Sequence, residues 1–219
     1  MFEDLTARAR IRDAALLQFA ERGVRGATIR GIAEAAGVSP GLVQHHFGSK
    51  EELRAACDTH AMEVIRRAND QATSTGMRDP GIFSVTMRAT MPVRRYVARA
   101  MVDGSPAAAK LFDDLVGYSE RYLADPPPGI AEPQTSDLHA YAATITALSL
   151  GIIVLHEHLS RALDVDTLTL EGYPRLGLAV LEVFTDDLLS PELVAQSRAT
   201  LEQFLKAGPS SAAGDGTPP

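Results

Sequence analysis

The sequence predicts an all-α protein, and three observations support this class. Apolar residues recur three and four positions apart over long segments, as Ile11, Ala15 and Phe19 do, which places them on one face of a helix. Prolines and glycines stand at positions where helices begin and end. No segment alternates apolar and polar residues as a half-buried strand would. The 219 residues are enough for one large domain or two small ones.

Residues 28–53 contain three helix starts in close succession, after a first helix that we expect over roughly residues 6–22. Each start has a residue that caps helices well, and each intervening end has a glycine that tolerates positive φ: Thr28, Ser39, Ser49, Gly37 and Gly48. Pro40 follows Ser39 in the first helical turn, where its missing N–H costs least. The third of these helices is expected to continue to about residue 69.

Two short helices joined by a tight turn form the helix-turn-helix of DNA-binding proteins, whose second helix enters the major groove. Here the second helix is predicted over residues 40–47, with Val43 and Phe47 on its inward face. The opposite face carries residues suited to base-edge or phosphate contacts: Pro40, Gly41, Gln44 and His45. Lys50 begins the next helix beside amide N–H groups that favour a phosphate. Further candidates for DNA contact, with capping or a plain surface position as the alternative, are Thr28, Arg30, Ser39 and His46.

The segment from Ile11 to Leu53 carries a specific pattern of small, apolar and capping residues: Ile11, Ala14, Ala15, Phe19, Ala20, Gly23, Thr28, Ile32, Ala33, Gly37, Val38, Ser39, Gly41, Phe47, Ser49, Lys50, Glu51 and Leu53. The segment with these residues in this order resembles the N-terminal domain of the TetR family of transcriptional regulators. Leu42 departs from the family, which usually has a small hydroxyl residue there, and Gln44 replaces its usual tyrosine. The resemblance implies an N-terminal three-helix helix-turn-helix DNA-binding domain and a C-terminal helical ligand-binding and dimerisation domain. We expect these at residues 1–54 and 55–208, followed by a disordered tail at 209–219.

Charge is distributed unevenly along the chain. The formal net charge is −7, but residues 1–60 contain eight basic and eight acidic side chains. The acidic excess therefore lies wholly in the remainder. A neutral DNA-binding domain implies few phosphate contacts per subunit, so we expect specific binding to need two such domains on one duplex.

The rest of the chain is expected to form a helical body. Helices are predicted over residues 82–101, 107–123, 138–163, 172–189 and 191–205, separated by segments rich in proline and glycine such as 71–81 and 125–133. Pro92 falls inside the first of them and should kink or divide it. The helix at 138–163 has no Asp, Glu, Lys or Arg between Asp137 and Glu157. We interpret it as buried on nearly all sides. A membrane span is the alternative, but polar residues interrupt it and no basic cluster flanks it.

The family resemblance makes two sets of body residues candidates for function. A ligand pocket is expected among apolar and aromatic residues in the middle of the body, with ordinary core as the alternative: Phe83, Met87, Met91, Phe112, Tyr118, Tyr122 and His156. A dimer interface is expected as a four-helix bundle from residues 141–163 and 172–189 of two subunits. Its candidate residues are Leu148, Ile152, Leu155, Leu159, Leu178 and Leu181.

His156, Glu157 and His158 suggest a metal site, but helical geometry argues against one. Residues i and i+2 of a helix point about 200° apart, so the two imidazoles cannot share one ion. We therefore expect no metal and no other cofactor. Cys57 is the single cysteine, which excludes an internal disulfide and a cysteine-based zinc site. We interpret it as a small packing residue rather than a redox sensor.

Together these features predict a homodimeric regulator that binds a double-stranded DNA operator and is released from it by a small apolar or amphipathic effector. The N-terminus lacks an apolar signal core, so we expect the protein in the cytoplasm. An activator, or a regulator of the same fold that needs no ligand, is the main alternative. An enzyme with an incidental helix-turn-helix is a remote one, because the sequence shows no nucleophile elbow, paired carboxylates, metal spacing or phosphate loop.

Overall fold

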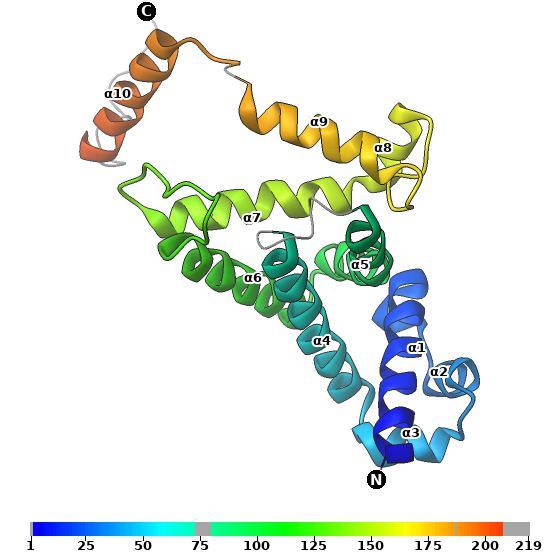
Figure 1. Ribbon diagram of the computed structural model, residues 1–219. Coiled ribbons are helices and arrows are strands. Elements are labelled where there is room, and N and C mark those ends of the chain that lie inside the picture. The colour runs from blue at the N-terminus through cyan, green and yellow to red at the C-terminus, as the bar shows by residue number, and fades with distance from the viewer. Residues whose placement is uncertain (1, 73–79, 187, 208–219) are drawn as a thin grey trace, which may run out of the picture. The chain divides into compact units, whose positions relative to one another are not determined.

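The computed structural model describes residues 2–72, 80–186 and 188–207, whose helices are shown in Figure 1. These residues form ten helices and contain no strand, which confirms the predicted all-α class. The chain divides into two compact units, residues 1–175 and residues 176–219, and each unit is described by itself. The expected tail at 209–219, and residues 73–79 of the expected loop, lie outside the described residues.

Three helices form the N-terminal part of the larger unit. Helix α1 spans Phe2–Gly26 and is longer at both ends than the sequence predicts; Gly23 within it has φ 68° and ψ 166°, so the regular helix is interrupted there. Helix α2 spans Ile29–Ala36 and α3 spans Pro40–Phe47. Between them Gly37 adopts the left-handed conformation, which a residue with a side chain rarely takes.

The next three helices lead from this part into the body. Helix α4 spans Lys50–Gln71, α5 spans Pro80–Met101 and α6 spans Pro106–Ala124. The sequence predicts that Pro92 kinks or divides α5, and the structure shows that the helix is not divided, because one helix continues through Pro92. Ser105 caps α6, and its hydroxyl accepts a hydrogen bond from the Ala108 amide at 3.2 Å. The prediction of separate helices over residues 82–101 and 107–123 is therefore confirmed.

The sequence predicts one helix over residues 138–163, and the structure contains two. Helix α7 spans Leu138–Val154 and α8 spans His156–Leu163, bent by 61° at Leu155. Leu155 has φ −90° and ψ 15°, and the imidazole N–H of His156 donates to the Ile153 carbonyl at 2.8 Å. This local hydrogen bond lies at the bend, and apolar periodicity does not reveal it. Within the described residues, no single helix combines the length and apolar composition of a membrane span; α7 and α8 pass that test only when joined across their bend.

Helices α9 and α10 complete the described chain. Helix α9 spans Tyr173–Thr185, shorter than the predicted 172–189, and α10 spans Pro191–Ala207. Both helices expose large apolar side chains: Leu178, Leu181, Val183, Phe184, Leu193, Leu201, Phe204 and Leu205. This degree of apolar exposure is typical of a surface that another protein chain covers.

One hydrophobic core runs through the larger unit. It begins among Ile11, Phe19 and Ile32 near the N-terminus and extends to α5 and α6 through Val93, Tyr96, Val97, Ala100, Leu111 and Leu115. Helix α1 packs against α5 (Figure 1), and the rings of Phe19 and Tyr96 lie with their centroids 6.3 Å apart. The boundary that the sequence predicts after residue 54 falls inside α4, which contributes core residues on both sides of that position.

Candidate functional site

Helix α3 has one buried face and one exposed face. Val43 and Phe47 are only 1% and 6% exposed, because their i, i+4 spacing turns both toward the core. Pro40, Gly41, Gln44 and His45 are exposed on the rest of the helix. The exposed residues therefore gather where a second helix of a helix-turn-helix meets the major groove.

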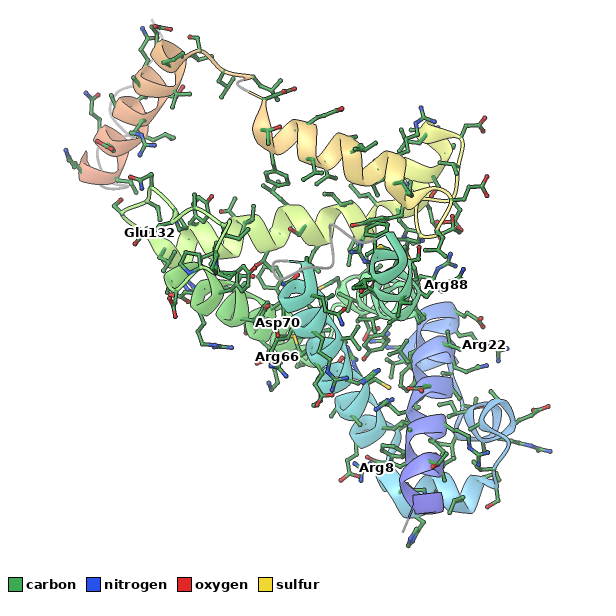
Figure 2. The ribbon with its side chains drawn as sticks, in the orientation of Figure 1. Arg8, Arg22, Arg66, Asp70, Arg88 and Glu132 are labelled. Atoms are coloured by element: carbon green, nitrogen blue, oxygen red, sulfur yellow. The ribbon has the colours of Figure 1, made fainter. Side chains whose placement is uncertain are left out.

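Short-range contacts fix the position of α3. The Ser39 hydroxyl accepts a hydrogen bond from the Leu42 amide at 3.2 Å at its N-terminus. At the other end, the Gly48 amide donates to the Gln44 carbonyl at 2.8 Å. Arg8 of α1 (Figure 2) lies over the Phe47 ring, with its guanidinium carbon 4.9 Å from the ring centroid. These contacts hold the exposed face rigidly, which precise base readout requires.

Several predicted DNA-contact residues have structural partners within the protein. The Thr28 hydroxyl caps α2 by accepting from the Gly31 amide at 3.1 Å. Lys50 is half-buried, and its ammonium donates to the Ala27 carbonyl at 3.2 Å. His46 is also half-buried, its ring centroid 5.6 Å from that of His45. Arg30, by contrast, is exposed on α2, as a side chain that reaches a phosphate must be.

A network of polar side chains joins α4 to α5 and to the start of α6. Arg54 is 7% exposed, and its guanidinium donates to Asp103 and to the Ser105 hydroxyl, each at 3.0 Å. On the next turn of α4, Asp58 accepts the Tyr96 hydroxyl at 2.5 Å. Sequence reasoning missed this network because its members lie up to 51 residues apart and no short motif connects them.

The two carboxylates of this network have opposite pKa shifts. Desolvation raises the pKa of Asp103, but hydrogen bonds from Ser105 and Arg54 outweigh it and hold that pKa below its usual value. Desolvation by burial raises the pKa of Asp58 above its usual value, although its hydrogen bond to Tyr96 and the charge of Arg54 oppose the change. The hydrogen-bond partners of Asp103 therefore favour its charged form, which is the counter-ion of Arg54.

A cavity of about 440 Å³ lies among α4, α5, α6 and α7. This volume falls in the range of small-molecule sites. Its wall is mostly apolar and includes residues from all four helices and from the loop before α7: Ile65, Val93, Val97, Leu115, Leu123, Ile130, Ile145, Leu150 and Ile153. The cavity therefore offers an apolar ligand a site whose wall includes α4 as well as α5, α6 and α7.

The predicted pocket residues are divided between this cavity and other places. Tyr118 and Tyr122 line it, with ring centroids 5.9 Å apart. Met87 and Met91 pack instead with Leu168 in a small separate core, against which Phe83 also packs. Phe112 and His156 are half-buried and do not line the cavity. The structure adds lining residues that sequence reasoning did not select: Asn69, Thr90, Arg94, Ser119, Thr146 and Ser149.

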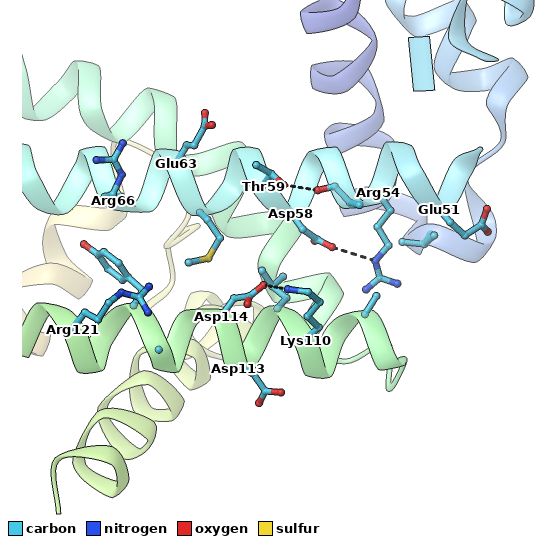
Figure 3. A pocket seen from close by; sticks show the side chains of 17 residues that line it. Glu51, Arg54, Asp58, Thr59, Glu63, Arg66, Lys110, Asp113, Asp114 and Arg121 are labelled. Atoms are coloured by element: carbon cyan, nitrogen blue, oxygen red, sulfur yellow. Dashed lines mark hydrogen bonds and ion pairs between the residues drawn. The ribbon is translucent and has the colours of Figure 1, made fainter. Parts of the chain in front are cut away.

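A larger hollow of about 730 Å³ lies between α4 and α6 (Figure 3). Charged side chains of both signs line it, and some pair with each other, as Lys110 and Asp114 do at 2.6 Å. Arg54 and Asp58 of the polar network form its wall near the start of α6. A wall of this kind suits water and ions more than an apolar ligand, so the smaller cavity is the better candidate for an effector site.

The predicted dimer residues are exposed or half-buried on their own helices. Leu148 on α7 and Leu155 at the bend are exposed, while Ile152 and Leu159 are half-buried. In the smaller unit, Leu178 is 62% exposed and Leu181 is 54% exposed. Exposure of this many large apolar side chains indicates that both units have surfaces available to another chain.

Two family models match the chain. The model described as "Bacterial regulatory proteins, tetR family" matches residues 11–57. The model described as "Tetracyclin repressor-like, C-terminal domain" matches residues 89–190. The first match includes α2, α3 and the start of α4, and the second includes most of α5 and the helices from α6 to α9.

Individual relatives extend this similarity. The HTH-type transcriptional regulatory protein RaaS of Mycobacterium tuberculosis is 35% identical over 206 residues, which cover 92% of this chain and 93% of that protein. The HTH-type transcriptional repressor KstR2 of Rhodococcus jostii is 32% identical over 111 residues, covering 51% of this chain and 50% of that one. A solved TetR-family transcriptional regulator from Rhodococcus sp. matches with a TM-score of 0.50 at 21% identity, over 68% of this chain and 86% of its own. At that identity the match shows a common fold.

Proposed function

Since the chain belongs to the TetR family of DNA-binding transcriptional regulators, we propose that it is a repressor that a small amphipathic molecule releases from its operator. The observation that supports this most is the two-sided character of α3. Val43 and Phe47 anchor the helix in the core, while Gln44 and His45 are exposed. A helix held in this way can enter the major groove without changing its own structure.

The DNA contacts divide into base contacts and phosphate contacts. Gln44 has the amide that pairs with an adenine edge, and His45 can donate or accept at a base. Gly41 and Pro40 let the backbone of α3 approach the duplex closely. Phosphate contacts come from Arg30 and from donors around the starts of α2, α3 and α4: Thr28, Ser39, His46 and Lys50.

The functional unit is a homodimer. A single DNA-binding part with eight basic and eight acidic residues in positions 1–60 attracts DNA only weakly. Two of them on one duplex double the base contacts and bind half-sites one or more helical turns apart. The interface, as in the family, is formed by Leu148 of α7, Leu155 at the bend, and Leu178 and Leu181 of α9, all of which are exposed, together with the half-buried Ile152 and Leu159. The dimer acts in the cytoplasm, where the operator is.

Ligand release follows from the position of α4. Ile65, Ala68 and Asn69 of α4 line the cavity, and the same helix begins at Lys50, directly after α3 and Gly48. A ligand that binds better to one orientation of α4 shifts the population toward the corresponding separation of the two α3 helices. The bound ligand then lowers the affinity for the operator. By linkage, the bound operator lowers the affinity for the ligand by the same factor.

Selection of genomic fragments tests the DNA-binding part of this proposal. The purified full chain is incubated with fragmented genomic DNA at moderate salt, and the retained fragments are measured against random duplex by fluorescence anisotropy. We expect a few fragments to bind at least a hundredfold more tightly than random DNA, since specific and non-specific affinities typically differ by about 10³ or more. Equal affinity for all fragments would contradict the proposal.

Deletion of the gene tests the direction of regulation. Transcription from a promoter next to a selected fragment is expected to rise when the gene is removed and to fall again when it is restored. A fall on deletion would instead support the alternative, an activator of the same fold. The same promoter carrying a scrambled fragment serves as the control and should not respond.

A further inference from the structure

The wall of the 440 Å³ cavity is unusual in its charge. Among the described residues that line it, Arg94 is the one with a charged side chain, and no aspartate or glutamate belongs to the set. Arg94 is half-buried on α5. The body that surrounds it carries the whole acidic excess of the chain, so a positive wall here is not a consequence of general composition.

Arg94 has no carboxylate partner among the described residues. Its guanidinium lies over the Tyr173 ring, 4.7 Å from the centroid, and one nitrogen donates to the Tyr173 hydroxyl at 3.3 Å. The neighbouring Arg95 does form an ion pair, with Asp166 at 3.0 Å. An arginine in an apolar wall with only a neutral partner keeps most of its capacity to bind an anion, and the low dielectric of the wall strengthens such a pair.

The remaining polar groups of the wall are largely engaged with each other. Asn69 donates to the Tyr118 hydroxyl at 3.1 Å, and Thr146 donates to the Ser119 hydroxyl at 2.8 Å. Thr90 donates to the carbonyl of Met87 at 3.1 Å on its own helix. The cavity therefore offers a ligand an extended apolar surface, a few neutral hydroxyl groups such as those of Tyr122 and Ser149, and one charged residue, Arg94.

We propose that the effector of this protein is an amphipathic anion, whose apolar part fills the cavity and whose carboxylate or similar group pairs with Arg94. This inference rests on the proposed function only in taking the cavity as the effector site. It narrows the proposed effector from any small amphipathic molecule to one that carries a negative group. Neutral molecules of the same shape gain the apolar contacts but lose the charge-assisted hydrogen bond.

Three probes with the same tail and different head groups test the proposal: decanoate, decanol and decylamine. Each is titrated into the full chain by isothermal calorimetry below the concentration at which it aggregates. We expect decanoate to bind at least tenfold more tightly than decanol, as one charge-assisted hydrogen bond predicts, and decylamine to bind most weakly. Decanoate that binds no tighter than decanol, including no measurable binding, would overturn the proposal.

Variants of α5 assign the preference to one side chain. Arg94→Met keeps an unbranched apolar stem but removes the charged group, and it should reduce the ratio of decanoate to decanol affinity to about one, while Arg94→Lys should keep part of the preference. Arg88 (Figure 2) is exposed on the same helix and does not line the cavity, so Arg88→Met should leave the ratio unchanged. Because the readout is a ratio within each variant, a loss of stability alone does not change it. A preference that survives Arg94→Met would overturn the assignment.

The same probes separate this inference from the proposed function. If decanoate binds through Arg94 but leaves the affinity for a selected genomic fragment unchanged, the ligand class stands and the release mechanism fails. If the protein binds the fragment specifically but shows no preference for decanoate, DNA recognition stands and the ligand class fails.

Discussion

Gln44 of α3 is the residue whose side-chain amide we propose to contact a base edge. It is exposed, while Val43 beside it is buried in the core. The carbonyl of Gln44 accepts the Gly48 amide at 2.8 Å, so the backbone at this residue is fixed and only its side chain is available. In the proposed complex with DNA, specificity at this position therefore depends on one amide group.

Replacing Gln44 by alanine should weaken specific binding and leave the fold intact. A good bidentate contact to a base is worth about 1–3 kcal/mol, so we expect affinity for a selected fragment to fall roughly tenfold or more while affinity for random duplex is unchanged. Fluorescence anisotropy measures both. Gln196→Ala, on the exposed surface of α10, is the matched control. Equal losses for specific and random DNA would show that Gln44 does not contact a base.

Asp58 connects stability to pH, because burial raises its pKa in the folded protein. The ordinary aspartate pKa is about 3.9. As pH rises above this value, Asp58 loses its proton in the unfolded chain but keeps it in the folded protein. The folded state therefore binds more protons than the unfolded state until pH exceeds the higher pKa of the folded state. In that window stability must fall as pH rises, and the penalty then stays constant above the folded-state pKa.

The variant Asp58→Asn isolates this effect. Relative to wild type, the variant should become progressively more stable as pH rises through the window above about 3.9, with a constant difference at higher pH. Urea unfolding at a series of pH values gives the free energy of unfolding of both proteins. A difference that is independent of pH, or that changes in the opposite direction, would exclude a raised pKa for Asp58.

At the scale of helices, the ends of α2, α3 and α4 depend on capping. Ser39 begins α3, and Ser49 begins α4 in a reciprocal capping box with Glu52, in which the Glu52 amide donates to the Ser49 hydroxyl at 3.1 Å and the Ser49 amide donates to the Glu52 carboxylate at 2.9 Å. A cap satisfies amides that have no partner within the helix. It therefore contributes to the orientation of α3 as well as to its stability.

Substitutions at Ser39 should test both contributions. Ser39→Ala removes the cap and is expected to cost about 1 kcal/mol of stability and to weaken operator binding. Ser39→Asn keeps a good N-cap and should retain wild-type stability. Thermal unfolding and anisotropy with a selected fragment are the measurements. If Ser39→Ala were as stable as wild type, α3 would not depend on its cap.

Helix ends near the N-terminus could be predicted from sequence because their signals are local. Thr28, Gly37 and Ser39 lie within a few residues of the hydrogen bonds they make or allow, so composition is enough. The same local signals predicted the exposed face of α3. They also indicated that Lys50 stands at a helix start, but not that its ammonium is held by the Ala27 carbonyl.

The bend at Leu155 and the wall of the cavity could not be predicted in the same way. The bend involves the His156 ring and the Ile153 carbonyl, whereas apolar composition continues across it. The cavity combines residues such as Asn69, Arg94 and Thr146 from three helices, and only the packing of those helices brings them together. Apolar content alone selected Met87 and Met91, which belong to a separate small core.

For the whole molecule, the proposed repressor needs two subunits. Leu178 and Leu181 of α9 are more than half exposed and lie three positions apart, so they share one face of that helix. Apolar side chains in such number are covered in most proteins by another chain. Two-fold symmetry then pairs each such surface with itself.

The double variant Leu178→Glu, Leu181→Glu should be monomeric and should lose operator binding. Four carboxylates introduced into one symmetric interface cannot be buried without a large desolvation cost. Leu17 is 50% exposed on α1, and Leu17→Glu is the control that should remain dimeric. Sedimentation velocity at micromolar concentration distinguishes the two states. A dimer that persists in the double variant would place the interface elsewhere.

Footprinting on the tightest selected fragment tests the central claim most directly, namely that two copies of α3 hold one duplex. We predict two protected half-sites whose centres lie about 10 base pairs, or a multiple of that spacing, apart. Protection of both half-sites should disappear together in the double variant Gln44→Ala, His45→Ala. Circular dichroism is expected to show that the fold of this variant is unchanged. A single protected half-site, or protection that the double variant retains, would contradict the account.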